Sequence, residues 1–234
     1  MNRAMEVSAI VPTLDEEAHV TPCLERLRAA GIGEILVVDG GSADRTRDRA
    51  SRVADRVLEV GGGLFVQLNA GGEAARGDVL VFHYADGHFP QEGVAAILRA
   101  LEDPRVLGGA FCLGFASSEL RYRLIAWGAG FRNRLGFGPF GDQTIFLRAR
   151  VFREIGGFDA DVFLADFELV REVRRRGTFR LLSLRLPTSV RRWEQRGVFR
   201  TLLWHWKLSA AYLLRVGRGN RARKNEAERL RRVR

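Results

Sequence analysis

The chain of 234 residues is long enough for one large α/β domain, or for one domain with an appendage. Its hydrophobic fraction of 46% and charged fraction of 28% are typical of a folded globular protein. Two cysteines argue against a disulfide framework or a zinc-binding pattern, so we expect a cytoplasmic protein. The sequence predicts neither a secretory signal nor a spanning helix, because no long uncharged apolar run is present.

The net charge of +10 is concentrated at the C-terminus. Residues 218–234 hold eight Lys or Arg against two Glu, and so contribute +6 of that charge. A basic tail of this kind is more often solvated or membrane-facing than bound to nucleic acid. We therefore expect no nucleic-acid partner.

Strands and helices are expected to alternate through the first hundred residues. The predicted strands span residues 7–11, 35–38, 57–60 and 78–82. The predicted helices span residues 16–29, 44–54 (with Asp44 as the N-cap), 67–75 and 90–101. This alternation predicts an α/β fold in which helices flank a mostly parallel sheet.

The second half of the chain changes character. A strand of a mixed sheet is predicted at 106–115, and further strands at 143–147 and 179–190. Helices are predicted at 120–131, 150–155 and 166–176. We expect one domain over residues 1–197, an amphipathic aromatic helix at 198–217 and a basic tail at 218–234.

The predicted helix at 198–217 is rich in Trp and Leu and carries interspersed basic residues. Such a helix can lie in a membrane interface, and the alternative is that it docks on the core of its own domain. With the basic tail, it favours peripheral association of residues 198–234 with the inner face of the membrane.

The most informative stretch is residues 34–46, where an apolar, β-branched run ends in Asp39, two glycines and Ser42. This pattern is typical of a buried parallel strand whose carboxyl end opens into a tight loop before a helix. Ligands of open α/β sheets bind at such carboxyl ends. The Asp39 carboxylate would suit hydrogen bonds to a base or ribose, whereas a glycine-rich phosphate loop with a Lys is lacking.

A series of motifs, in order and spacing, resembles glycosyltransferase family 2 with the GT-A fold, and its small single-domain bacterial subgroup in particular. The resemblance extends to about residue 215. The motifs in the first half are VPTLDEE at 11–17, VVDGGSADRT at 37–46, NAG at 69–71, ARGD at 75–78 and AD at 85–86. Those in the second half are GDQ at 141–143, GGF at 156–158, DFEL at 166–169 and RRWE at 191–194.

The resemblance implies an inverting glycosyltransferase that moves a sugar from a UDP- or GDP-linked nucleotide-sugar to the hydroxyl of an unknown acceptor. Asp86 takes the position of the acid that binds a divalent metal, Mn²⁺ or Mg²⁺, on the diphosphate. Asp166 takes the position of the general base. Gln143 and Arg191, Arg192 and Trp193 take positions near the diphosphate and the acceptor. The implied nucleotide-binding residues are Pro12, Thr13, Leu14, Asp15, Glu16, Asp39, Gly41, Ser42 and Asn69.

The chain departs from the subgroup at positions that cluster on the implied site. A subgroup His is replaced by Tyr84, a Glu by Ala165 and a Thr by Gly87, and the arginines before Asn69 give way to Leu64, Phe65 and Val66. Tyr is a poor metal ligand because its phenol is protonated at neutral pH. Either donor and metal use have shifted, or the chain is a degenerate protein that serves as a nucleotide- or membrane-binding module.

Several polar residues also have a structural interpretation. His83 and His88 are expected to be structural rather than metal ligands. Cys23, on a helix, and Cys112, in a strand, are expected in the core. Asp44 is expected to cap a helix rather than to contact a ligand.

Overall fold

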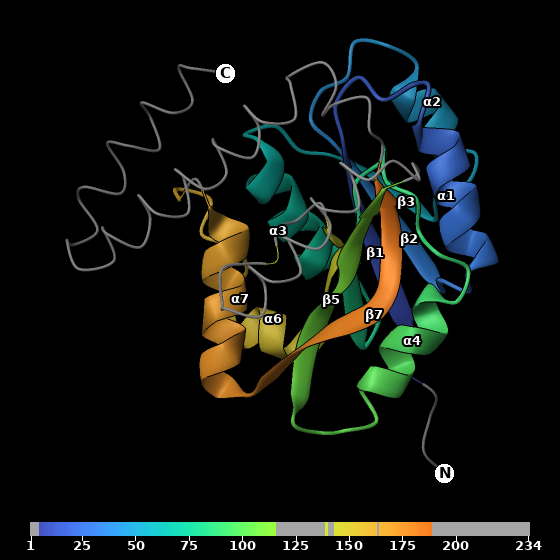
Figure 1. Ribbon diagram of the computed structural model, residues 1–234. Coiled ribbons are helices and arrows are strands. Elements are labelled where there is room, and N and C mark those ends of the chain that lie inside the picture. The colour runs from blue at the N-terminus through green and yellow to red at the C-terminus, as the bar shows by residue number, and fades with distance from the viewer. Residues whose placement is uncertain (1–4, 116–138, 140–142, 163, 189–234) are drawn as a thin grey trace.

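The computed structural model describes residues 5–115, 139, 143–162 and 164–188, which form one mixed sheet with helices on both faces (Figure 1). The strands are β1 (Val7–Thr13), β2 (Glu34–Asp39), β3 (Arg56–Glu59), β4 (Val79–Phe82), β5 (Val106–Phe115), β6 (Ile145–Arg148) and β7 (Thr178–Thr188). The helices are α1 (Val20–Ala29), α2 (Thr46–Ala50), α3 (Leu64–Ala74), α4 (Gly93–Ala100), α6 (Ala149–Ile155) and α7 (Ala165–Arg176). The predicted α/β class is confirmed.

The strand order is β3-β2-β1-β4-β6-β5-β7. Strand β6 is antiparallel to both of its neighbours, and the other pairings are parallel. The carboxyl ends of all strands except β6 therefore lie at one end of the sheet. Strand β6 begins at that same end, so the residues just before it join the loops that follow the other strands.

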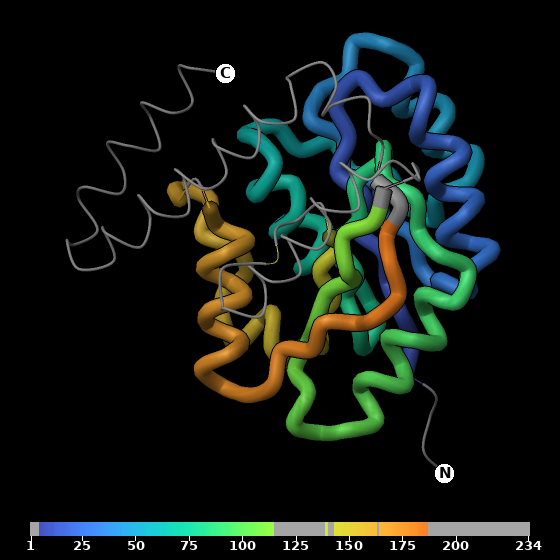
Figure 2. Tube along the Cα trace, viewed as in Figure 1, coloured from blue at the N-terminus to red at the C-terminus, as the bar shows by residue number. Residues whose placement is uncertain are grey.

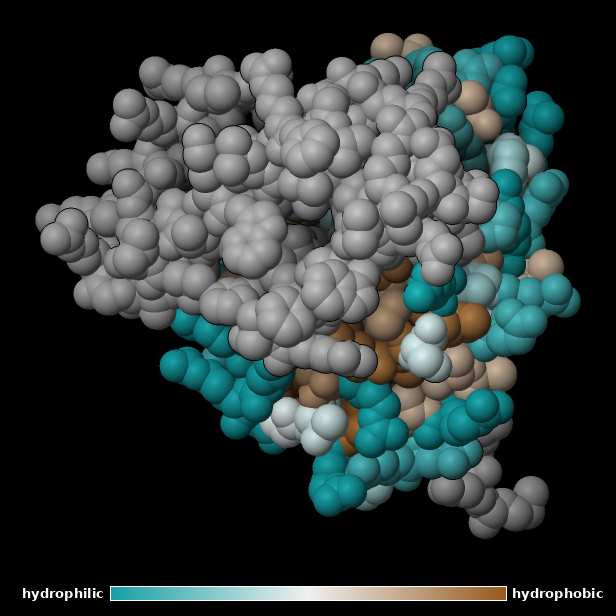
Figure 3. Space-filling model, in the orientation of Figure 1, coloured by the Kyte–Doolittle hydropathy of each residue, from teal (hydrophilic) through white to brown (hydrophobic). Residues whose placement is uncertain are grey.

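Both faces of the sheet are covered, which accounts for the continuous apolar runs of its central strands. In β2, Ile35 and Val37 pack into the core shared with α1, α2 and α4, whereas Leu36 and Val38 pack into the core shared with α3, α6 and α7. Figure 1 shows these two groups of helices on opposite sides of the sheet. Hydrophilic residues cover the outer surface over α1 and α2, at the upper right of Figure 3.

Helix α3 lies close against the sheet because two consecutive glycines face its neighbours. A Cβ atom at Gly72 would come within 2.5 Å of Cε1 of Phe152, and one at Gly71 would collide with the side chain of Ile10. A larger residue at either position would push the helix outward. This close packing brings the polar side chains of Gln67 and Asn69, which lie earlier in α3, within hydrogen-bond distance of their partners.

Strands β5 and β7 are far apart in the sequence but lie side by side, as Figure 2 shows. They pair in parallel from Val106 opposite Thr178 to Phe115 opposite Thr188. Because α7 precedes β7 and runs back alongside the sheet, its N-terminus lies at the carboxyl end of the parallel strands. The residue Asp166 in the first turn of α7 is thus brought to the same end as the loops after β1, β2 and β4.

Several predicted boundaries are wrong by a few residues. The helix predicted from residue 16 begins at Val20, the one predicted from 67 begins at Leu64, and the one predicted over 90–101 spans only Gly93–Ala100. The helix predicted over 44–54 shortens to Thr46–Ala50, and its N-cap position is Arg45 rather than Asp44. The Asp44 carboxylate instead accepts hydrogen bonds from the N–H groups of Thr46 and Glu17, because it lies between two loops that it joins.

Some expectations fall outside the described residues. These are the helix at 120–131, the residues Arg191, Arg192 and Trp193, and the segments 198–217 and 218–234. Within the described ranges, no helix is both long enough and apolar enough to cross a membrane.

Candidate active site

The loops that follow β1 and β2 are joined to one another by side-chain hydrogen bonds. The backbone N–H of Asp15 donates to Oγ of Ser42 at 2.9 Å, and the N–H of Ala43 donates to Oδ1 of Asp15 at 2.8 Å. The N–H of Glu16 donates to Oγ1 of Thr46 at 2.8 Å. Asp15 adopts a left-handed backbone conformation with φ of 55°, which these reciprocal bonds hold in place. These hydrogen bonds join the two loops into one unit, and we call its residues 12–16 and 39–42 the rim.

Asp39 is fully buried at the base of this rim. Its Oδ1 accepts the N–H groups of Gly41 and Ser42 at 3.0 and 2.8 Å, and its Oδ2 accepts the hydroxyls of Thr13 and Ser42 at 2.9 and 2.5 Å. Burial by itself would raise the pKa of Asp39, but the hydrogen bonds from Ser42, Thr13 and Gly41 outweigh it and lower the pKa below its ordinary value. The chain itself occupies the four acceptor positions of the carboxylate.

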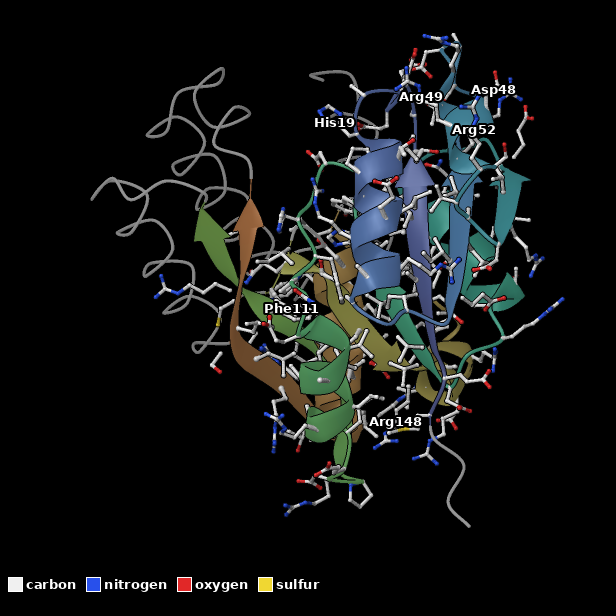
Figure 4. All side chains as sticks on the ribbon, turned by 90° about the vertical axis from the view of Figure 1, so that its right-hand side faces the viewer. His19, Asp48, Arg49, Arg52, Phe111 and Arg148 are labelled. Carbon is white, nitrogen blue, oxygen red and sulfur yellow. The ribbon has the colours of Figure 1, made fainter. Side chains whose placement is uncertain are left out.

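The outer surface of the rim is a network of acids and arginines. Glu17 pairs with Arg45 at 2.9 Å and with Arg49 at 2.8 Å, and Arg47 pairs with Glu59 at 2.6 Å. Figure 4 shows Arg49 and His19 at this end of the molecule, with Arg148 at the opposite end. These pairs lie at or near the surface, and pairs of this kind contribute little to stability.

Gln67 on α3 is a residue of this region that the sequence did not indicate. Its side-chain Nε2 donates to the carbonyl oxygens of Thr13 at 3.0 Å and of Val38 at 2.8 Å, while Gly40 N–H donates to the same Thr13 oxygen at 2.8 Å. The buried amide on α3 thus connects the carboxyl ends of β1 and β2. No local pattern marks this role, since the bonds span 54 and 29 residues.

The remaining predicted nucleotide residues differ in exposure. Pro12 and Thr13 are buried at the end of β1, whereas Leu14 is 58% exposed and Gly41 is exposed with φ of 100°. Of the described residues, Leu14 and Leu64 (36% exposed) are the large hydrophobic side chains that face solvent. Leu14 and Gly41 thus present exposed groups at the ends of β1 and β2, whereas Asp39 lies beneath them in the core.

Asn69 is committed to the protein's own backbone. Its Nδ2 donates to the carbonyl of Phe158 at 2.8 Å, and its Oδ1 accepts the N–H of Phe158 at 2.8 Å. The preceding Gly157 has φ of 77° and lies so close that a Cβ there would be 2.5 Å from Oδ1 of Asn69. The NAG and GGF motifs are thus in direct contact, and together they set the path of the chain towards α7.

Asp86 lies half-buried in the loop after β4, and Tyr84 is half-buried beside it. Among the described residues no group of three or more His, Cys, Asp or Glu side chains could enclose a metal ion. A cation such as Mg²⁺ is often held by one or two carboxylates together with substrate phosphates and water. A carboxylate at this loop fits an ion of that kind, and does not fit a metal enclosed by protein ligands.

Asp166 and Gln143 are both brought to the same end of the sheet. Asp166 is 8% exposed in the first turn of α7, and its Oδ1 accepts the N–H of Phe167 at 2.8 Å. Gln143 is buried just before β6, where its Nε2 donates to the carbonyl of Phe111 at 3.0 Å. Ala165, which replaces the expected Glu, is the first residue of α7 and is buried in the core on its sheet-facing side.

Solved structures that resemble this fold include two glycosyltransferase complexes. One is a mannosyltransferase from Pyrobaculum calidifontis in complex with GDP-Man and Mn²⁺, with a TM-score of 0.66 at 20% identity over 81% of this chain and 58% of that one. The other is a fragment of TarS from S. aureus in complex with UDP-GlcNAc, with a TM-score of 0.63 at 15% identity over 79% of this chain and 58% of that one. The scaffold is therefore the GT-A fold of glycosyltransferases.

The sequence profile of Glycosyl transferase family 2 matches residues 8–156. The chain belongs to this family. An undecaprenyl-phosphate 4-deoxy-4-formamido-L-arabinose transferase from Pseudomonas paraeruginosa is 32% identical over 116 residues, which are 44% of this chain and 34% of that protein. The chain thus matches about a third of the length of this relative.

Proposed function

We propose that this protein is an inverting glycosyltransferase that transfers a sugar from a UDP- or GDP-linked donor to an acceptor hydroxyl. The observation that carries the proposal is the convergence of four elements at one end of the sheet. These are the joined loops after β1 and β2, the Asp86 loop after β4, Gln143 before β6 and Asp166 at the start of α7. A nucleotide-sugar needs a pocket for its nucleotide, a site for its diphosphate and a base for the acceptor.

The nucleotide is assigned to the rim formed by residues 12–16 and 39–42, with Asn69 acting behind it. Asp39 acts on the nucleotide through the loop it shapes, since its acceptor positions are filled by Thr13, Gly41 and Ser42. Backbone groups of the loop and the exposed Leu14 then remain to meet the base and ribose. The donors in the complexes of the two similar structures, GDP-Man and UDP-GlcNAc, support this class of ligand.

The leaving diphosphate is assigned to Asp86, with Arg191, Arg192, Trp193 and Gln143 close to it and to the acceptor. A divalent cation, Mn²⁺ or Mg²⁺, would be held by Asp86 and would supply positive charge against the diphosphate. The Mn²⁺ in the Pyrobaculum complex supports this assignment. Asp166 would accept the proton of the acceptor hydroxyl as that oxygen attacks the anomeric carbon from the face opposite the leaving group.

The acceptor is proposed to lie at a membrane surface. The Pseudomonas relative is named for undecaprenyl phosphate, which is a lipid. The aromatic and basic segment 198–234 would associate with the inner face of the membrane and bring the site close to a hydroxyl carried at that surface.

A second candidate is a degenerate member of the family that retains nucleotide or membrane binding without transfer. The apolar start of α3 favours it, because Leu64 and Val66 stand where cations would have faced the donor phosphates and Leu64 is 36% exposed. Such a protein would bind a nucleotide with little help from a metal ion.

Calorimetric titration with UDP and GDP, each with and without Mn²⁺, separates the two candidates. Transferase function predicts that one nucleotide binds and that Mn²⁺ tightens its binding by at least tenfold. Binding that Mn²⁺ does not change supports the degenerate protein. If neither nucleotide binds, the assignment of a UDP or GDP site to the rim is wrong for both candidates.

A further inference from the structure

His83 lies directly after β4, three residues before Asp86, and is buried. Its Nδ1 is 2.7 Å from Oγ1 of Thr144, which lies just before β6 and is also buried. The antiparallel register, with Phe82 opposite Ile145, brings these two residues together across the sheet. One hydrogen bond thus connects the loop after β4 with the segment that enters β6.

The loop that carries Asp86 folds over the His83 imidazole. A Cβ atom at Gly87 would be 2.6 Å from Cε1 of His83, and the N–H of Gly87 closes a turn onto the carbonyl of Tyr84 at 2.9 Å. The ring also packs edge-to-face on Phe89, with centroids 5.5 Å apart. The position of the Asp86 loop therefore depends on the ring beneath it.

An apolar residue would serve equally well if His83 only filled space. Its Nε2 is buried and makes no hydrogen bond of standard geometry among the described residues, although the Gly87 backbone lies close enough to favour the protonated ring. A buried nitrogen with so poor a partner is unfavourable. The retained Nδ1 contact is thus the feature that a histidine offers here. Burial, with smaller contributions from the charges of Arg26 and His88 and partly opposed by the backbone of Gly87, lowers the pKa of His83 to about 4.

The partner of His83 has an unusual backbone. Thr144 has φ of 49°, which is uncommon for any residue other than glycine and a marked outlier for a β-branched one. Strained conformations of this kind persist when the surroundings hold them, and they cluster at functional sites. Thr144 directly follows Gln143, so its backbone sets the direction in which Gln143 enters the site.

We propose that His83 is a positioning residue that couples the Asp86 loop to the Gln143–Thr144 segment through its hydrogen bond to Thr144. The proposal rests on the proposed function, which assigns both segments to the leaving diphosphate and the acceptor. It also accounts for Gly87, since a threonine there would collide with the imidazole. His83 and Gly87 are therefore a matched pair in this chain.

The test uses the full-length protein and the variants T144V and H83F. T144V keeps the β-branched shape and removes the hydroxyl, whereas H83F keeps a ring and removes the nitrogen. The matched control is T178V, at an exposed threonine at the start of β7. Amide hydrogen exchange of the nucleotide-free protein reports on the Gly87 N–H, and Mn²⁺-dependent UDP or GDP binding reports on the site.

We expect the Gly87 amide to exchange about tenfold faster in T144V and in H83F than in the wild type and T178V. The double variant should exchange no faster than either single variant, because both remove the same bond. In T144V, Mn²⁺ should enhance nucleotide binding about tenfold less than in the wild type, with metal-free affinity unchanged.

Unchanged Gly87 exchange in T144V would overturn the proposal, even if its melting temperature falls, because packing alone would then explain His83. If H83F does not fold, T144V decides the outcome. If the wild type binds neither nucleotide, the proposed function fails while the exchange data still decide whether the two segments are coupled.

Discussion

Asn69 binds both backbone polar groups of Phe158, donating from Nδ2 to its carbonyl and accepting its N–H at Oδ1, each at 2.8 Å. A side chain expected at the nucleotide thus joins α3 to the loop that leads into α7. Phe158 is further held by rings of Phe65, Phe82 and Phe152, with centroids 5.0 to 5.9 Å apart. These two hydrogen bonds fix the backbone of Phe158 against α3, and Phe158 lies in the segment that leads to Asp166.

Replacing Asn69 by Leu should destabilise the protein by about 2–4 kcal/mol, because two backbone groups of Phe158 lose their partners. Chemical denaturation measures this loss. E73L, at an exposed residue of the same helix, is the control and should change stability by no more than about 0.5 kcal/mol. An N69L variant as stable as the wild type but with weakened nucleotide binding would instead assign Asn69 to the ligand.

Substitutions of Asp39 should separate a loop-shaping role from a direct nucleotide contact. In D39N the amide oxygen can still accept from Gly41 and Ser42, while the hydroxyls can turn to accept from the amide nitrogen. We expect D39N to lose about 1–2 kcal/mol and to keep nucleotide affinity within about threefold, whereas D39A should lose about 3–5 kcal/mol.

Denaturation and calorimetry on the same samples check both expectations for Asp39. D48N, at an exposed acid on α2 labelled in Figure 4, is the control for charge. A tenfold or greater loss of nucleotide affinity in D39N with near-normal stability would show that the carboxylate meets the ligand directly.

Replacing Asp166 by Asn should abolish sugar transfer while leaving nucleotide binding unchanged. The amide cannot accept the acceptor proton, and loss of a general base lowers rates by about 10²–10⁴-fold. Turnover of the nucleotide-sugar and calorimetry give the two readouts, with D161N, at an exposed acid before α7, as the control. Retained turnover in D166N would remove Asp166 from the mechanism.

The stability of the protein should fall as the pH is lowered from about 6.5 to about 4. His83 is buried and neutral, and its folded pKa of about 4 lies below the ordinary 6.5, so in this range the unfolded state binds a proton that the folded state does not. The contribution is complete above pH 6.5 and falls by about 3 kcal/mol by pH 4.

Denaturant titrations at several pH values measure this dependence on His83. H83F should flatten the slope between pH 6.5 and 4, whereas H19N, at an exposed histidine at the start of α1, should leave it unchanged. An equal slope in H83F and the wild type would show that other groups cause the acid sensitivity.

Truncation after residue 197 should reduce association with membranes. The removed segment holds the aromatic residues of the predicted helix at 198–217 and the tail with a net charge of +6, which would be attracted to anionic lipid. Co-sedimentation with vesicles containing anionic lipid should fall several-fold relative to the full-length chain, and added salt should weaken the full-length binding. Equal sedimentation of both proteins would exclude 198–234 as the membrane contact.

The elements of the first half could be predicted because their signals are local. Strands β1 and β2 are apolar runs that end in turn residues, and the amphipathic pattern of α1 repeats within the helix itself. The motifs at 11–17 and 37–46 also predicted which strand ends would carry the site. Helix starts were displaced where loop residues such as Asp44 bond to another loop, an arrangement that the local sequence does not record.

The sequence by itself determined the α/β class, the family and the identity of the acids at the strand ends, because periodicity and turn chemistry are properties of neighbouring residues. Only the tertiary structure decided what those side chains touch. The Gln67, Asn69 and His83 contacts join residues 29 to 89 positions apart. They exist because α3 packs closely on the sheet and β6 enters it in the opposite direction, and burial then requires each polar group to find its partner within the fold.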